Sequence, residues 1–350
     1  MNRRTTVGLV SLCLLAVLWG VAALTPLPYV TYRPGPTVDV LSRTDGAESV
    51  VVSGHQAYRD DGELRLTTIY VDQPQEDVTL PELLQAYFSP DAAVYPRAAV
   101  YAPEATDEST DRESEVQMVS SQESAVATAL TALGHDVEAA VEVLDVGDDL
   151  PADGVLEVGD ELLRVGPTAV TEPQDVVDAV DAAPVDEPLE FELRRDGEVQ
   201  VVRVTPRLLD GDKRVGITPG EDYTFPFDVR VAIRDDIGGP SAGLMMALAV
   251  YDTLTPGSLT GGGKVAGTGT IDKAGLVGRI GGIQQKIAGA RDTGTELFLV
   301  PAGTCDGIDG VDPGNMRLAR VETMAQALDA IAAWVEDPET PLPTCDDEAP

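Results

Sequence analysis

The distribution of hydrophobic residues first marks an uncharged run near the N-terminus. Residues 7–24 form an 18-residue stretch without a charged side chain, a length in the lower part of the range for a membrane-spanning helix. Arg3 and Arg4 precede it and the next basic residue is Arg33, so the positive-inside rule predicts a cytoplasmic N-terminus. The alternative is a cleaved signal peptide, whose apolar core would be shorter, about 7–15 residues. We expect an uncleaved single-pass anchor in the cell membrane, with the rest of the chain outside the cytoplasm.

Beyond the anchor, stretches with the period of a strand are followed by stretches with the period of a helix. Strand-like stretches at 49–52 and 63–71 predict two strands. Helical spacing predicts helices at 80–88 and 120–133. The polar, acidic stretch 103–115 predicts a loop between these two helices.

A second pattern follows in the middle of the chain. A short strand at 141–144 precedes a helix at 172–183, where Val176, Val177 and Val180 have helical spacing. Two further alternating runs then meet at Asp196-Gly197, which is a strong hairpin signal. These elements predict a compact unit, mostly of strands, that is separate from the pattern on either side of it.

Composition and charge narrow the classes of function. The chain has 24 basic and 60 acidic residues and a formal net charge of -36, which excludes a nucleic-acid binder because phosphate contacts need a basic face. The 43% of hydrophobic residues excludes an acidic disordered polymer. Only 2 residues are His, and only four are Lys, so any catalytic base comes from a short set. The two histidines, His55 and His135, are expected to be solvated.

The three cysteines agree with export. Cys13 lies in the predicted anchor, and Cys305 and Cys345 are the two that follow it. An oxidising compartment favours a disulfide between these two, although two unpaired thiols are the alternative. No Cys-x-x-Cys spacing occurs, so neither a structural zinc site nor another metal is predicted.

A candidate nucleophile lies in the segment GGPSAG, residues 238–243. Pro240 suits a first helical position, so Ser241 is expected in the first turn of the helix that follows. The backbone amides of Gly239, Ser241 and Ala242 would then face a reacting oxygen at the positive end of the helix. The alternative is that Ser241 is only an N-cap residue.

The same segment fits the G-x-S-x-G elbow of α/β-hydrolases, but that family needs an Asp and then a His after the serine. No His follows position 135, so this chain order fails. Lys286 is the remaining candidate base, because it lies at i+3 from Ile283, on the apolar face that also carries Ile287. Such a face can lower the pKa of the amine by the roughly 3 units that a base requires. Snorkelling of the lysine to solvent is the alternative.

Three blocks of sequence resemble the proteolytic domain of Lon-type serine proteases, and most closely the membrane-anchored, PDZ-containing Lon-like proteases. They are GGPSAG, VAGTGTI at 265–271 and GRIGGIQQKIAGARDTGTELFLVP at 278–301. The resemblance implies that Ser241 is the nucleophile and Lys286 the general base, with Thr268 positioning the lysine. The chain departs from many ATP-driven Lon enzymes at Gly238, where they have an acidic residue.

The middle unit resembles a PDZ domain through the run GVLEVGDELLRVGPTAV at 154–170. This resemblance implies a groove that binds an extended peptide by strand addition; a spacer that binds nothing is the alternative. An ATPase module is not expected, because Gly261–Val265 does not satisfy the P-loop pattern: position 258 is Ser and no Ser or Thr follows Lys264. No cofactor is expected.

Together these features predict an α+β protease domain with an inserted, mostly β PDZ domain. The expected parts are a cytoplasmic segment (1–6), a transmembrane helix (7–24), the N-terminal part of the protease domain (37–136), the PDZ domain (137–206), the catalytic part (207–335) and a poorly ordered acidic tail (336–350). The expected function is ATP-independent serine endopeptidase activity on exported or unfolded proteins. A non-catalytic PDZ scaffold or holdase and a His-dependent hydrolase are the alternatives, and the sequence leaves a homo-oligomer open.

Overall fold

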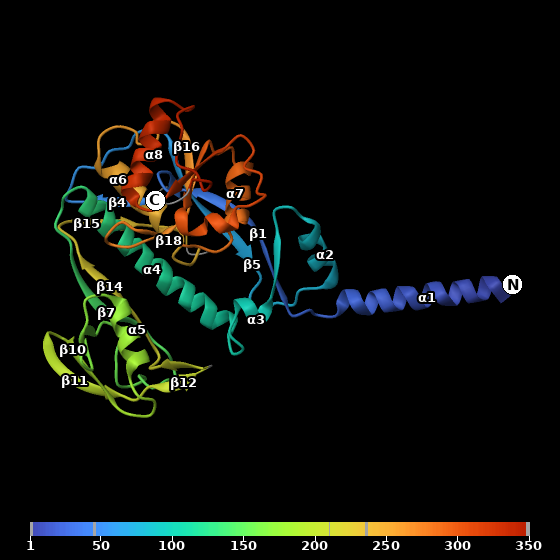
Figure 1. The fold of residues 1–350 in the computed structure, drawn as a ribbon, viewed down its shortest axis with the longest axis horizontal. Helices are drawn as coiled ribbons and strands as arrows, with labels where there is room; N and C mark the ends of the chain where they lie inside the picture. Colours follow the sequence, from blue (N-terminus) through green and yellow to red (C-terminus); the bar gives the residue numbers. More distant parts are fainter. Residues whose placement is uncertain (1–2, 45–46, 210, 235–236, 348–350) are drawn as a thin grey trace.

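The computed structural model describes residues 3–44, 47–209, 211–234 and 237–347. Residues 1–2 of the predicted cytoplasmic segment and 348–350 of the predicted tail lie outside these ranges. The described chain forms a body with two large sheets and several two-stranded pairs, from which one helix projects (Figure 1). The helices are α1 (Arg3–Leu24), α2 (Leu80–Phe88), α3 (Arg97–Val100), α4 (Asp107–Ala132), α5 (Pro173–Ala182), α6 (Gly243–Leu254), α7 (Ile283–Asp292) and α8 (Met324–Glu336), with a 3-10 turn η1 (Ala302–Gly307).

The first sheet has six strands and carries helices on both faces. In spatial order its strands are β20 (Arg317–Val321), β19 (Leu297–Pro301), β16 (Lys264–Gly267), β5 (Glu63–Val71), β1 (Tyr29–Asp39) and β6 (Ala93–Pro96). The four strands from β20 to β5 are parallel, and β1 is antiparallel to both of its neighbours. Leu297 and Leu299 point into the core that contains α4, α6 and α8, whereas Phe298 and Val300 point to α7. Successive side chains of a strand face opposite ways, which explains this division into three layers.

The second sheet has a core of its own and lies beyond the N-terminal half of α4 (Figure 1). Its strands are β11 (Glu198–Val204), β10 (Leu189–Arg195), β8 (Glu161–Val165), β7 (Glu138–Val146) and β14 (Ile217–Thr224), with β9 (Thr168–Ala169) beside β8. The hairpin predicted at Asp196-Gly197 is present, and both residues have positive φ, 51° and 82°. This unit extends past the expected boundary at 206, because β14 pairs with β7 along its whole length.

Shorter strands complete the fold. They are β2 (Arg43–Thr44), β3 (Ala47–Glu48), β4 (Val50–Ser53), β12 (Arg207–Leu209), β13 (Asp212–Arg214), β15 (Asp228–Val231), β17 (Thr270–Ile271) and β18 (Val277–Gly278). The pair β4–β15 contributes Val50, Val229 and Val231 to the core around α6. Helices and strands are thus mixed throughout the chain, as the α+β prediction requires.

Two predictions from the polar pattern were wrong. The expected loop at 103–115 is largely the first half of α4, which begins at Asp107 rather than at Ser120. Thr106 caps this helix by accepting from the Ser109 amide at 3.1 Å, and two acidic residues in the first turn favour the positive end of the helix dipole. The tail after α8, predicted to be poorly ordered, packs against the protein at more points than Cys345. Leu342 is buried in the core, and the Arg320 amide donates to the Pro343 carbonyl.

Helix α1 fits the predicted anchor by length and composition. Residues Thr6–Leu24 form an apolar stretch of 19 residues with mean hydropathy 2.5, none of which is buried inside the protein. A signal sequence would pass the same test of length and composition. In Figure 1 the helix projects from the body on the side of α2.

Candidate active site

Ser241 lies in the turn that precedes α6, at the carboxyl end of the parallel strands. The helix begins at Gly243 with Ala242 as its N-cap, so the expectation that Pro240 begins the helix and that Ser241 lies in its first turn was wrong. Gly239 has φ 84°, a conformation that glycine adopts without strain. This turn places Ser241 just outside the helix, where its hydroxyl can be approached.

Lys286 reaches the Ser241 hydroxyl from the opposite layer of the fold. It lies in the first half of α7, and only 2% of the residue is exposed to solvent. Its Nζ lies 2.7 Å from Ser241 Oγ and 3.0 Å from Thr268 Oγ1. The lysine therefore points into the fold and does not snorkel to solvent.

Thr268 follows strand β16 directly and joins the two side chains. It accepts from Lys286 Nζ at 3.0 Å and donates its hydroxyl proton to the Ser241 carbonyl at 2.9 Å. The Gly269 amide donates to the same carbonyl at 2.8 Å. These bonds connect the lysine side chain to the backbone of the serine. Thr268 is completely buried, so water does not compete for them.

Burial determines the protonation of Lys286. Removal from water lowers the pKa of its ammonium group from 10.5 to about 7, because a low-dielectric surrounding disfavours the charged form. Within the described part of the chain its side-chain hydrogen bonds go to two hydroxyl groups and to no carboxylate. A substantial fraction of this amine is therefore neutral near pH 7 and able to accept a proton.

The predicted oxyanion donors divide into two groups. The Gly239 amide donates to the Ser114 carbonyl at 2.9 Å, so it is occupied and the expectation that it faces a reacting oxygen was wrong. No acceptor is assigned to the amides of Ser241 and Ala242 among the described residues. Both stand at the N-terminus of α6, where the helix dipole favours negative charge.

Helix α4 supplies two contacts to the serine turn that sequence reasoning missed. The Ser114 carbonyl accepts from Gly239, and Ser121 Oγ donates to the Pro240 carbonyl at 3.0 Å. The polar pattern around Ser114 predicts a loop, and nothing in the local pattern connects either serine with residues more than a hundred positions away. The sequence offered no signal for these contacts apart from the helical spacing after Ser120.

The two histidines lie elsewhere and pack against one aromatic ring. The His55 ring stacks on Phe227 with centroids 4.5 Å apart, and His135 meets the same ring edge-on at 5.2 Å. His55 is exposed but His135 is half-buried, so the expectation of two solvated histidines is correct only for the first. Neither ring is a hydrogen-bond partner of Ser241.

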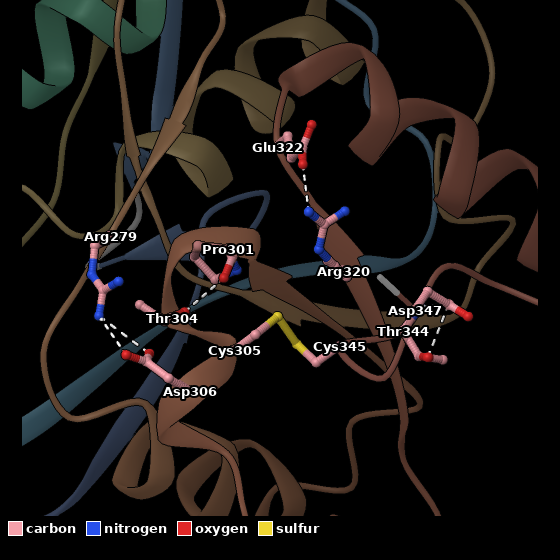
Figure 2. Close-up of a disulfide and its surroundings, with 10 residues drawn as sticks. All are labelled: Arg279, Pro301, Thr304, Cys305, Asp306, Arg320, Glu322, Thr344, Cys345 and Asp347. Atoms are coloured by element: carbon pink, nitrogen blue, oxygen red, sulfur yellow. Dashed lines mark hydrogen bonds and ion pairs between the residues drawn. A yellow bond between two sulfur atoms is a disulfide. The ribbon is translucent and has the colours of Figure 1, made fainter. Parts of the chain in front are cut away.

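Cys305 and Cys345 are joined in a disulfide with their Cα atoms 5.3 Å apart (Figure 2). Cys305 belongs to η1, which follows β19, and Cys345 belongs to the tail. Figure 2 shows Arg320 of β20 beside this link, paired with Glu322. The remaining cysteine, Cys13, is an exposed free thiol in α1. No group of three or more potential metal ligands occurs in the described ranges.

The region that carries these residues is similar to a known family of proteolytic domains. Residues 232–333, which include Ser241, Thr268 and Lys286, match the family model described as the Lon protease (S16) C-terminal proteolytic domain. The chain is 36% identical to the Lon protease of Lachnoclostridium phytofermentans over 84 residues, which cover 23% of this chain and 10% of that protein. It is also 36% identical to the Lon protease of Clostridioides difficile over 95 residues, which cover 26% of this chain and 12% of that protein. The predicted Lon resemblance is confirmed, and these matches support a peptidase of the serine type.

The matched region is short relative to the whole relatives, because the chain spans about a tenth of the length of the curated relatives it matches. Among solved structures, the PDZ domain of the SdrC-like protein from Listeria innocua is 21% identical, with 22% of this chain and 90% of that chain covered and a TM-score of 0.21. The PDZ domain of the SdrC-like protein from Listeria monocytogenes is 23% identical, with 23% and 86% covered and a TM-score of 0.22. Each match covers less than a quarter of this chain and most of the solved domain.

Proposed function

We propose that this protein is a membrane-anchored serine endopeptidase that uses a Ser241–Lys286 dyad without ATP. The observation that carries the proposal is the 2.7 Å contact between Lys286 Nζ and Ser241 Oγ inside a buried site. A lysine that is removed from water without a carboxylate partner costs stability, and a base with a pKa of about 7 is suited to catalysis near neutral pH.

The mechanism follows from the arrangement of these groups. Lys286 takes the proton of Ser241 Oγ while this oxygen attacks the carbonyl carbon of a peptide bond. The amides of Ser241 and Ala242 stabilise the negative oxygen of the tetrahedral intermediate. The lysine then gives its proton to the leaving amine, and water attacks the acyl-enzyme with Lys286 again as the base. Thr268 keeps the amine directed at the serine in each step.

A hollow beside the second sheet supports the proposal of a binding site for an extended chain. A hollow of about 940 Å³ lies between α4, α5 and β14, with Val176 and Val180 on one side and Ile217 and Thr218 on the other. We propose that this unit acts as a PDZ domain and that a polypeptide segment adds to the sheet beside β14. Its capture raises the concentration of substrate near Ser241.

We assign α1 to the cell membrane and the remaining chain to the outside of the cytoplasm. The run Thr6–Leu24 supports the anchor, and Arg3 and Arg4 before it support the orientation. The disulfide agrees with an oxidising compartment. Without a phosphate loop in the sequence, we propose that substrates arrive already extended, as loops, unfolded tails or exported peptides.

A serine-reactive fluorophosphonate tests the dyad. The full chain in detergent is treated with the probe, and the modified residue is identified by mass spectrometry. Ser241→Ala and Lys286→Arg should abolish both labelling and peptide hydrolysis, because arginine remains protonated and cannot act as a base. The matched controls are Ser53→Ala, at an exposed serine, and Lys264→Arg, at a partly exposed lysine that pairs with Glu63; both should keep full activity.

Two results would contradict the proposal. Turnover by Lys286→Arg would exclude the lysine as the base, and a folded wild-type chain that neither reacts with the probe nor cleaves unfolded protein would favour a non-catalytic scaffold. ATP dependence is measured in the same assay with an unfolded protein as substrate. An increase in the rate of hydrolysis on addition of ATP would contradict the proposal that this activity is independent of ATP.

A further inference from the structure

Helix α2 has an outward face that is apolar instead of polar. Pro81, Leu84 and Phe88 follow one another at i, i+3 and i+7 and form one stripe of the helix. Phe88 is 77% exposed and Leu84 40%, whereas Ala86 on the inner side is 5% exposed. Tyr87, 71% exposed, flanks the stripe, and its ring meets the Phe88 ring edge-on at 5.3 Å. A short helix in water would normally show charged residues on this side.

The chain places this helix at the end of α1. The Leu27 amide, three residues after α1 ends, donates to the Val78 carbonyl at 2.9 Å, and α2 begins two residues after Val78. The two helices are in direct contact. In Figure 1, α2 is the helix of the body that lies nearest to the base of α1.

The length of α1 determines where its end lies relative to a bilayer. Its apolar stretch of 19 residues, Thr6–Leu24, spans about 28 Å as a helix, close to the roughly 30 Å of the hydrocarbon core. The last turn of α1 then lies at the boundary between hydrocarbon and headgroups. Because α2 packs against this end, it must lie at the same depth.

We propose that the outward face of α2, formed by Pro81, Leu84, Tyr87 and Phe88, inserts into the outer interface of the bilayer that α1 spans. This inference rests on the proposed membrane anchor. Tyr and Phe side chains suit the headgroup region, where an aromatic ring is removed from water while its polar edge stays hydrated. The helix lies along the surface and fixes a second point of the catalytic body on the membrane.

The charge of α2 and of the whole protein favours uncharged lipids as the partner of this face. The single charged residue of α2 is Glu82, which is turned away from the stripe and accepts from the Thr79 amide at 2.8 Å. The net charge of -36 would repel anionic lipids. Insertion therefore depends on the apolar side chains and not on basic residues.

Spin labels at single cysteines test the depth of α2. The full chain, with Cys13→Ala and the disulfide left in place, is reconstituted in phosphatidylcholine vesicles. Nitroxides are attached at Phe88→Cys, Leu84→Cys, Leu15→Cys in α1 and Leu208→Cys in β12, an exposed leucine of the second unit. Collision rates are measured with oxygen, which concentrates in lipid, and with a water-soluble nickel chelate. Labelling of Ser241 by the fluorophosphonate confirms that each variant is folded.

The proposal expects the oxygen-to-nickel ratio at positions 84 and 88 to exceed that at 208 severalfold and to stay below the ratio at 15, which lies in the middle of the span Thr6–Leu24. If the oxygen-to-nickel ratio at 84 and 88 is as low as at 208 while the ratio at 15 is high, α2 does not insert into the bilayer although α1 spans it. This result would overturn the proposal and leave the anchor intact. An aqueous ratio at 15 would instead refute the anchor. Low collision rates with both reagents at 88, with dipolar broadening between labels, would show that a second copy of the chain covers this face and would also overturn the proposal.

Discussion

The central residue of the site is a lysine whose surroundings make its charge unfavourable. Lys286 has two hydroxyl partners and almost no contact with water. The sequence predicted this position from the apolar spacing of Ile283 and Ile287, and the resemblance to Lon blocks assigned the role. The occupied amide of Gly239 could not be predicted, since its acceptor, Ser114, lies 125 positions earlier in the chain.

The pH dependence of hydrolysis should follow the titration of Lys286. Its pKa of about 7 is lowered by burial, and only the neutral amine accepts the serine proton. The rate constant kcat/KM should therefore increase between pH 6 and 8 by about tenfold, following the fraction of neutral amine. Initial rates with a short fluorogenic peptide measure this, and circular dichroism at each pH controls for unfolding. A rate that is constant or falls over this range would argue against a lysine base.

Removal of the Thr268 hydroxyl should reduce activity without abolishing it. Thr268→Val loses one hydrogen bond to the amine and one to the Ser241 carbonyl, so we expect kcat to fall by about tenfold. Thr268→Ser keeps the hydroxyl and should recover most of the rate. If valine and serine variants were equally active, the threonine would have no positioning role.

At the scale of elements, α4 shows most clearly where pattern reading fails. No residue of this helix before Met118 is buried, so the periodicity of its first half carries no signal of a buried face. By contrast, α2, α5 and the hairpin at Asp196-Gly197 were predicted correctly because caps, prolines and turn residues mark their ends locally. Arg112 connects α4 with Asp145 of β7, a contact that no local pattern reveals.

The contact between α4 and the serine turn leads to a second kinetic prediction. Ser121→Ala removes the hydroxyl that donates to the Pro240 carbonyl, and we expect kcat to fall roughly fivefold while KM changes little. The adjacent Ser120→Ala is the matched control and should be close to wild type. A change in KM alone would show that α4 affects binding of substrate and not the position of the nucleophile.

The disulfide should contribute to stability more than to catalysis. It closes a loop with a sequence separation of 40, for which the chain-entropy model gives about 4 kcal/mol. Replacing both Cys305 and Cys345 by serine should lower the free energy of unfolding in urea by this amount and leave the rate at 25 °C nearly unchanged. An unchanged denaturation midpoint would contradict the prediction.

At the scale of the molecule, the second unit enters and leaves the chain at adjacent points. Glu138 and Thr224 are partners in the register of β7 and β14, so their Cα atoms lie about 5 Å apart. The sequence predicted the insertion but ended it at 206. Strand β14, which lies beyond the predicted boundary, follows a bend at Gly216 and pairs with β7, the first strand of the unit. Local periodicity cannot reveal such a long-range pairing.

Replacing residues 138–224 by a short Gly-Ser linker should separate the two proposed activities. The first sheet and the dyad lie outside this range, so cleavage of a short fluorogenic peptide should stay within about threefold of wild type, whereas cleavage of an unfolded protein should fall by about tenfold or more. The same assays on the full chain give the reference. Equal losses on both substrates would show that the second unit supports the catalytic fold and does not capture substrate.

The tail that is held by the disulfide covers part of the β20 edge of the first sheet. Strand β20 is an outer strand, and its Arg320 amide is satisfied by the Pro343 carbonyl, while the Arg317 side chain donates to the Thr340 carbonyl at 2.6 Å. Three prolines at 338, 341 and 343 lack the amide hydrogen that a further strand would need. The covered edge therefore cannot accept a strand from another molecule, and a reduced protein with a released tail would present it for aggregation.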